Sequence, residues 1–184
     1  MLTPGIFTPL CALALFSSLT PSHSNAMKFA AEDARPASEA QAQEVNDADL
    51  IVPGKRIGQL SIGMTVQEVY TVMKGADPTE TMAGTNGSRL YKWGSDAKWV
   101  SVIIDVKTER VSYVGTNDPR FATKEGIRVG DSQFTLDAKM GPPQRRQIPD
   151  DNNGLSLLWY GRRAMRIIVQ HGKVTSIDIW VPDK

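Results

Sequence analysis

Residues 126–143 read GIRVGDSQFTLDAKMGPP, and residues 58–78 read GQLSIGMTVQEVYTVMKGADP. Each stretch has a glycine, a short apolar-alternating segment that ends in glycine, a polar pair, a stretch with helical spacing, and then glycine and proline. The chain of 184 residues therefore contains the same local pattern twice. This repetition is the feature of the sequence that decides the predicted fold.

The middle of each stretch predicts a short helix. Thr65 and Glu68 have the spacing of a capping box, in which the threonine accepts from a helical amide and the glutamate reaches back. Ser132 takes the place of Thr65 in the second copy. Gly75 and Gly141 stand where a left-handed residue ends a helix, and proline follows each of them closely. We therefore expect one short helix in each copy.

Strand-like segments joined by turn signals follow each predicted helix. They span 89–94, 99–106 and 110–114 after the first helix, and 157–161, 164–170 and 173–177 after the second. A three-stranded meander with one short helix buries too little surface alone, so the two units are expected to share a core. The predicted fold class is α+β: two tandem repeats of a short helical segment followed by a three-stranded antiparallel meander, forming one continuous sheet with the helices on one face.

The first 50 residues differ in composition from the rest. Residues 1–26 have no charged side chain, contain a short apolar run and end in Ser-Asn-Ala, which is the pattern of a secretory signal peptide. Residues 27–50 are acidic and poor in aromatic residues, as flexible leaders are. We predict a signal peptide at 1–26, an acidic flexible leader at 27–50, repeat unit one at 51–120 and repeat unit two at 121–184. The protein is then periplasmic or secreted after signal removal; a retained anchor is the alternative.

The composition removes the usual catalytic and metal-binding sets. Cys11 is the only cysteine, and His23 and His171 are the only histidines. Cys11 and His23 both fall within the predicted signal peptide, which leaves one histidine and no cysteine in the mature chain. Zinc sites and Ser-His or Cys-His catalysis lack their usual parts in such a chain. We therefore expect no enzyme activity, no cofactor and no metal, and export with modest basicity argues against nucleic-acid binding.

Side-chain alternation along the predicted strands defines two faces of the sheet. The inner face, expected to pack on the helices, carries Val100, Val102, Ile104, Val106, Met165, Ile167, Val169, Ile177, Ile179 and Val181. The opposite face, called the outer face below, carries aromatic and apolar side chains among charges: Trp99, Ile103, Tyr113, Arg166, Ile168 and Trp180.

The composition of the outer face is typical of a protein-binding surface. We predict that these six residues bind another envelope or secreted protein, with the aromatic residues as anchors and Arg166 as the charged selector. Soluble proteins seldom leave large apolar patches uncovered. The alternative is therefore that the leader or a loop covers this face, or that a second copy does so in a homodimer.

The doubled pattern of a glycine-flanked apolar segment, a short helix, a glycine before proline and three strands resembles two known families. It is similar to the tandem-repeat β-lactamase inhibitory proteins and to the single-repeat outer-membrane assembly lipoproteins of the SmpA/OmlA (BamE) type, over about residues 51–181. The resemblance implies an exported, non-enzymatic protein that binds another protein through its open sheet face or loops. Two features differ: such inhibitors carry disulfides and such lipoproteins begin with a lipidated cysteine, whereas the mature chain has no cysteine.

Two other functions are left open by the sequence. One is a small-ligand or lipid-binding periplasmic module, with its ligand in the groove between helices and sheet. The other is an uncharacterised hydrolase, although no pair of carboxylates in the sequence is marked out for that chemistry.

Overall fold

The computed structural model describes residues 46–150 and 153–182. The predicted signal peptide and residues 27–45 of the predicted leader lie outside the described residues. The last part of that leader forms the 3-10 helix η1 (Asp47–Asp49) and enters strand β1 (Leu50–Val52). In the part of the chain that the structure describes, no helix is long and apolar enough to cross a membrane.

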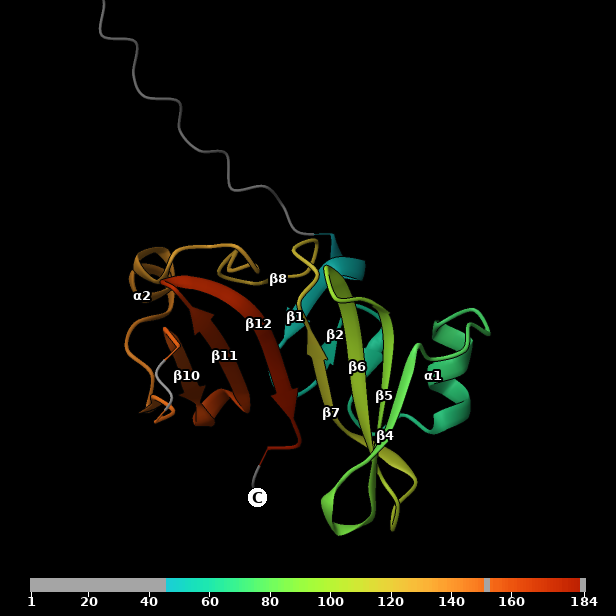
Figure 1. The fold of residues 1–184 in the computed structure, drawn as a ribbon. Coiled ribbons are helices and arrows are strands. Elements are labelled where there is room, and N and C mark those ends of the chain that lie inside the picture. Colours follow the sequence, from blue (N-terminus) through green and yellow to red (C-terminus); the bar gives the residue numbers. More distant parts are fainter. Residues whose placement is uncertain (1–45, 151–152, 183–184) are drawn as a thin grey trace, which may run out of the picture. The chain divides into compact units, whose positions relative to one another are not determined.

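Most of the regular secondary structure in the described chain lies in two sheets (Figure 1). The larger sheet has eight strands in the order β4-β5-β6-β7-β12-β11-β10-β9, and all its pairings are antiparallel. Its strands are β4 (Glu80–Ala83), β5 (Ser88–Ser95), β6 (Lys98–Asp105), β7 (Arg110–Thr116), β9 (Arg145–Gln147), β10 (Leu155–Tyr160), β11 (Met165–Gln170) and β12 (Lys173–Trp180).

The smaller sheet has four short strands in the order β3-β2-β1-β8. They are β1, β2 (Arg56–Ile57), β3 (Leu60–Ser61) and β8 (Ala122–Thr123), and β1 pairs with β8 in parallel. The two α-helices of the described chain are α1 (Val66–Val72) and α2 (Gln133–Met140). Two further 3-10 helices are η2 (Thr85–Gly87) and η3 (Gly161–Arg163).

The predicted fold class is wrong. The chain is mostly β and has two separate sheets, not two helix-plus-three-strand units in one continuous sheet. The edge strands β4 and β9 were not predicted, because every residue of both is exposed and neither shows hydrophobic alternation in the sequence. Only their backbone pairing with β5 and β10 defines them as strands. In the segment 58–63, expected to be one extended piece, only Leu60–Ser61 forms a strand, β3, which pairs with β2 across a turn at Gly58 (φ +57°).

The local helix signals are confirmed. Thr65 and Glu68 form both hydrogen bonds of a capping box, and the Ser132 side chain accepts from the Thr135 amide. Gly75 after α1 (φ +75°) and Gly141 at the end of α2 (φ +72°) both have the positive φ that glycine permits, but Gly141, with ψ −174°, is not in the left-handed helical conformation. These signals depend only on residues close in sequence, which is why they could be predicted without the fold.

The core lies between the inner face of the larger sheet and a layer formed by the smaller sheet and both helices. Its members include Val102, Ile167 and Ile177 from the larger sheet, Ile57 from the smaller one and Leu136 from α2. The inner-face assignment fails only at its ends: Val106 is 51% and Val181 48% exposed, because each lies just beyond its strand. Phe134, on α2, is an apolar residue that is 83% exposed.

Candidate functional site

One row of side chains crosses the whole outer face of the larger sheet. Strand pairing places these residues side by side, in order from β4 to β9: Glu80, Lys92, Ser101, Gly115, Asp178, Arg166, Trp159 and Arg145. The next row joins Ile103 on β6, Tyr113 on β7 and Trp180 on β12. Tyr113 and Trp180 therefore flank the Gly115–Asp178 pair where β7 and β12 meet.

An ion pair occupies the centre of this row. Arg166 donates to Asp178 Oδ2 from Nε at 2.9 Å and from Nη2 at 2.7 Å, and Nη2 also donates to the Tyr113 hydroxyl at 3.1 Å. The Asp178 side chain is 2% exposed and that of Arg166 is 24% exposed. The described residues offer Arg166 Nη1 no hydrogen-bond partner, so this edge of the guanidinium retains free donors.

Gly115 provides the space in which this carboxylate lies. A Cβ atom built on Gly115 would lie 2.8 Å from Asp178 Oδ1 and 3.2 Å from both Ser101 Oγ and Tyr113 Cε1. The φ of Gly115 is not positive, so the residue is required by the close approach of these atoms and not by its backbone conformation. Glycine at position 115 therefore allows the Asp178 carboxylate to pack directly against the backbone of β7.

Burial dominates the protonation behaviour of this cluster. It raises the pKa of the Asp178 carboxyl above its ordinary value, and the positive charge of Arg166 opposes this rise. Burial also raises the pKa of the Tyr113 hydroxyl, and the negative charge of Asp178 adds to that rise. Tyr113 is therefore a neutral phenol that keeps its proton well into the alkaline range.

Two tryptophans border the ion pair. Trp159 and Trp180 meet edge to face with ring centroids 5.5 Å apart, and the guanidinium carbon of Arg166 lies 5.1 Å from the Trp159 ring centroid. Trp159 Nε1 is buried and has no hydrogen-bond partner among the described residues. We call Tyr113, Trp159, Arg166, Asp178 and Trp180 the central cluster.

The six residues predicted for the outer face are placed differently by the structure. Tyr113, Arg166 and Trp180 belong to the central cluster, and Ile103 is paired with Tyr113 on the neighbouring strand. Ile168 lies on β11 opposite Ser176, one row away. Within the described chain, the Trp99 side chain makes no ring contact or hydrogen bond with the central cluster. All six are half-buried, which is less open than a flat exposed face would be.

Sequence reasoning missed Trp159 as a site residue and left Asp178 out of the predicted set. A signal for Trp159 was present, because β10 alternates strictly: Ser156, Leu158 and Tyr160 are buried while the residues between them are half-buried. The close approach at Gly115 had no sequence signal, since it depends on β7 pairing with β12 across about 60 residues of chain.

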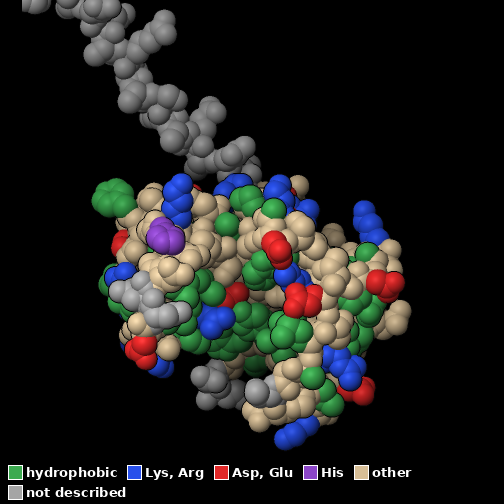
Figure 2. All heavy atoms as spheres, in the orientation of Figure 1, with side chains coloured by type: hydrophobic (Ala, Val, Ile, Leu, Met, Phe, Trp, Pro, Cys, Tyr) green, Lys and Arg blue, Asp and Glu red, His purple; other side chains and the backbone are tan. Residues whose placement is uncertain are grey.

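The surface over the middle of the larger sheet is hollowed. Figure 2, in the orientation of Figure 1, shows hydrophobic side chains gathered in this hollow with a basic and an acidic side chain among them. Across the described part of the chain, no group of three or more His, Cys, Asp or Glu residues is placed to hold a metal ion. The chemistry that this face offers is apolar contact and hydrogen-bond donation.

Comparison with known proteins gives similarities of fold only. No family model matches the chain, and no curated protein matches it significantly. Solved structures to which the chain is similar include the DUF4309 family protein YjgB from Bacillus subtilis (14% identity, 69% of this chain and 87% of that one, TM-score 0.49) and the uncharacterised protein YfeY from Escherichia coli (13% identity, 70% and 98%, TM-score 0.49).

A third similar structure is an extracellular protein from Bacillus anthracis that contains an SCP domain (9% identity, 65% of this chain, TM-score 0.46). The match spans 43% of that protein, less than half of its length. None of these three proteins is named as a β-lactamase inhibitory protein or an outer-membrane assembly lipoprotein, so that resemblance stays a prediction. At these identities and TM-scores no function is transferred to this chain.

Proposed function

We propose that the chain is a non-enzymatic protein of the periplasm or the extracellular medium that binds another protein through the outer face. The observation that carries the proposal is the central cluster: a nearly buried ion pair bordered by two tryptophans, on the side of the sheet away from the core. Export rests on the signal-like composition of residues 1–26.

The cluster has the chemistry of an interface centre. Tryptophan, tyrosine and arginine are the residues most often found at positions that dominate binding energy, and they act best where water is excluded. Trp159 and Trp180 supply apolar area, and Arg166 Nη1 supplies free donors that select a partner presenting a carbonyl or carboxylate oxygen. The partner expected here therefore combines an apolar segment with an acceptor at its centre.

The proposal is tested by capture from an envelope extract of the cells that make the protein, with the mature chain from Met27 as bait. The test variant is Trp159→Ala/Trp180→Ala, and the matched control is Phe134→Ala, an exposed aromatic residue on α2. Loss of true anchors weakens binding by on the order of 2 kcal/mol or more, which is about thirtyfold. Capture retained by the control and lost by the double variant supports the proposal.

Two results contradict it. Equal capture by all three chains places any partner elsewhere. A concentration-dependent dimer in sedimentation, abolished by the double variant, means instead that a second copy covers the outer face. Circular dichroism of each variant confirms that the comparison is made between folded chains.

A further inference from the structure

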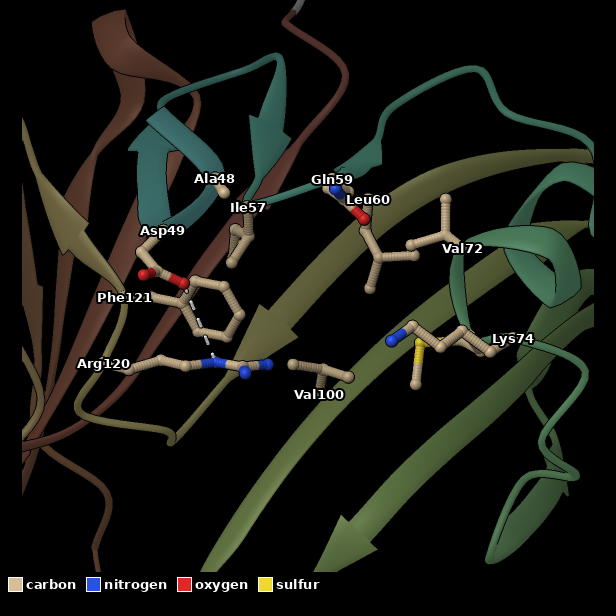
Figure 3. A pocket seen from close by; sticks show the side chains of 11 residues that line it. Ala48, Asp49, Ile57, Gln59, Leu60, Val72, Lys74, Val100, Arg120 and Phe121 are labelled. Carbon is tan, nitrogen blue, oxygen red and sulfur yellow. Dashed lines mark ion pairs between the residues drawn. The ribbon is translucent and has the colours of Figure 1, made fainter. Parts of the chain in front are cut away.

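A pocket of about 410 Å³ opens on the other side of the larger sheet, between β6, the smaller sheet and the end of α1 (Figure 3). Its apolar walls come from elements far apart in sequence: Ile57, Leu60, Val72, Met73, Val100 and Phe121. This volume lies within the range of small-molecule sites. Val100 alternates with Trp99 along β6, so the pocket and the outer face lie on opposite sides of the same strand.

Two cationic side chains enter this pocket from opposite sides. Figure 3 shows the Lys74 amine and the Arg120 guanidinium pointing toward each other, with Val100 between them. Arg120 is partly neutralised, because its Nε lies 3.3 Å from Asp118 and 4.0 Å from Asp49. The amine of Lys74 has no ion pair or hydrogen bond in the described chain, so it is free to pair with an anion.

The backbone of Lys74 belongs to the turn that ends α1. Lys74 has a φ of +56°, a left-handed conformation that residues other than glycine seldom adopt. The Lys74 amide donates to the Thr71 carbonyl and the Gly75 amide to the Tyr70 carbonyl, which fixes the turn that ends α1.

We propose that this pocket binds a free medium-chain monocarboxylic acid. Its hydrocarbon chain would lie against Leu60, Val72 and Val100, and its carboxylate between Lys74 and Arg120. An anion there relieves the repulsion between the two cations, and a carboxylate accepts charge-assisted hydrogen bonds from both. Asp49 and Asp118 already neutralise part of the charge of Arg120, so the unpaired amine of Lys74 is the group that repels a cation and that a neutral molecule would leave without a partner.

The test compares three probes of equal chain length on the mature protein: octanoate, octanol and octylammonium. Binding is followed by calorimetry and located by amide chemical shifts in NMR spectra. We expect octanoate to bind about tenfold more tightly than octanol, with octylammonium weakest, and to shift the amides of residues 57–60, 72–74 and 120–121. The preference for octanoate should fall with added salt, because both cations are exposed at the rim.

Substitution of Lys74 tests the proposal more directly than the comparison of probes. Lys74→Gln should weaken octanoate binding about tenfold and leave octanol binding unchanged, whereas Lys107→Gln, an exposed lysine in the β6–β7 turn, should change neither. Equal affinity for octanoate and octanol, unchanged octanoate binding in Lys74→Gln, or absence of binding to the folded wild-type protein would each overturn the proposal. The Trp159→Ala/Trp180→Ala chain should bind octanoate normally, so this proposal and the proposed function fail separately.

Discussion

Replacement of Arg166 by methionine is the most informative single perturbation of this fold. Methionine keeps much of the apolar stem of the arginine but removes both hydrogen bonds to Asp178 and the one to Tyr113. Above its raised pKa, the Asp178 carboxylate would then be charged, 2% exposed and without its cation. Tyr113 would lose the guanidinium that its hydroxyl faces, and Trp159 the cation at its ring.

Loss of one partner from a buried ion pair destabilises proteins by about 3–5 kcal/mol. We expect the Arg166→Met variant to lose about 3 kcal/mol at neutral pH, near the lower limit, because the Arg166 side chain is 24% exposed and water already screens part of the pair. A domain of this size has a free energy of unfolding of about 5–15 kcal/mol, so the variant should still fold.

The pH dependence provides an independent check. Asp178 has a folded-state pKa above its unfolded value, and the charge of Arg166 opposes that rise, so Arg166→Met raises the pKa further. Between the unfolded value, about 3.9, and this raised value the folded state binds more protons than the unfolded state. Stability in that window therefore increases as the pH falls. The deficit of Arg166→Met should be complete above the raised pKa and should shrink as acid protonates Asp178.

The assay is urea unfolding followed by circular dichroism, over a series from neutral to acidic pH. The double variant Arg166→Met/Asp178→Asn carries no buried charge, so it should recover part of the loss and lack the pH dependence. Arg163→Met serves as control, because its pair with Glu125 is 41% and 29% exposed and should be worth less than about 1 kcal/mol. A cost for Arg166→Met no larger than that of the control would refute the desolvated pair.

Other predictions test neighbouring features. Gly115→Ala should cost about 1–3 kcal/mol in urea unfolding because its Cβ would lie 2.8 Å from Asp178 Oδ1, whereas Gly161→Ala, with no atom within 4 Å, should cost little. Thr65→Ala removes the capping box of α1 and should cost about 1 kcal/mol by the same measurement. Because the pKa of Tyr113 is raised, its hydroxyl should stay protonated until the protein unfolds in alkali, so wild type and Tyr113→Phe should show the same phenolate absorbance change before that transition. The stability due to Tyr113 should be lost only as the pH rises above about 10. A smaller absorbance change in the variant would contradict this.

The sequence predicted the parts of the fold that are carried by local or alternating patterns. The strand 99–106 was placed within one residue of β6, and its buried residues Val100, Val102 and Ile104 face the core as expected. The helix caps were also correct, because Thr65 and Ser132 act on amides three residues away. The number of sheets was wrong because the strands of the smaller sheet have only two or three residues, which is too short for a periodic signal.

The side-chain alternation that defined the outer face could not predict how the residues of that face are arranged across the strands. Alternation places Trp99 and Ile103 on the same side of β6, yet it says nothing about which strand lies beside β7. The pairing of β7 with β12 is what brings Tyr113 to Trp180 and Gly115 to Asp178. Trp99 was placed on the outer face by the same alternation, and it lies at the second position of β6, away from the row that contains Tyr113 and Trp180.

The central cluster combines two properties that the experiments must keep apart. Apolar residues in place of Arg166 and Asp178 would make the outer face uniformly apolar, and such a surface binds many partners. A buried hydrogen-bond donor disfavours any partner that lacks a hydrogen-bond acceptor. In the proposed function Arg166 has two roles, which are stability through Asp178 and selectivity through its free Nη1 edge. A loss of binding in Arg166→Met could come from either, which is why the binding test removes Trp159 and Trp180 and the stability test removes the ion pair.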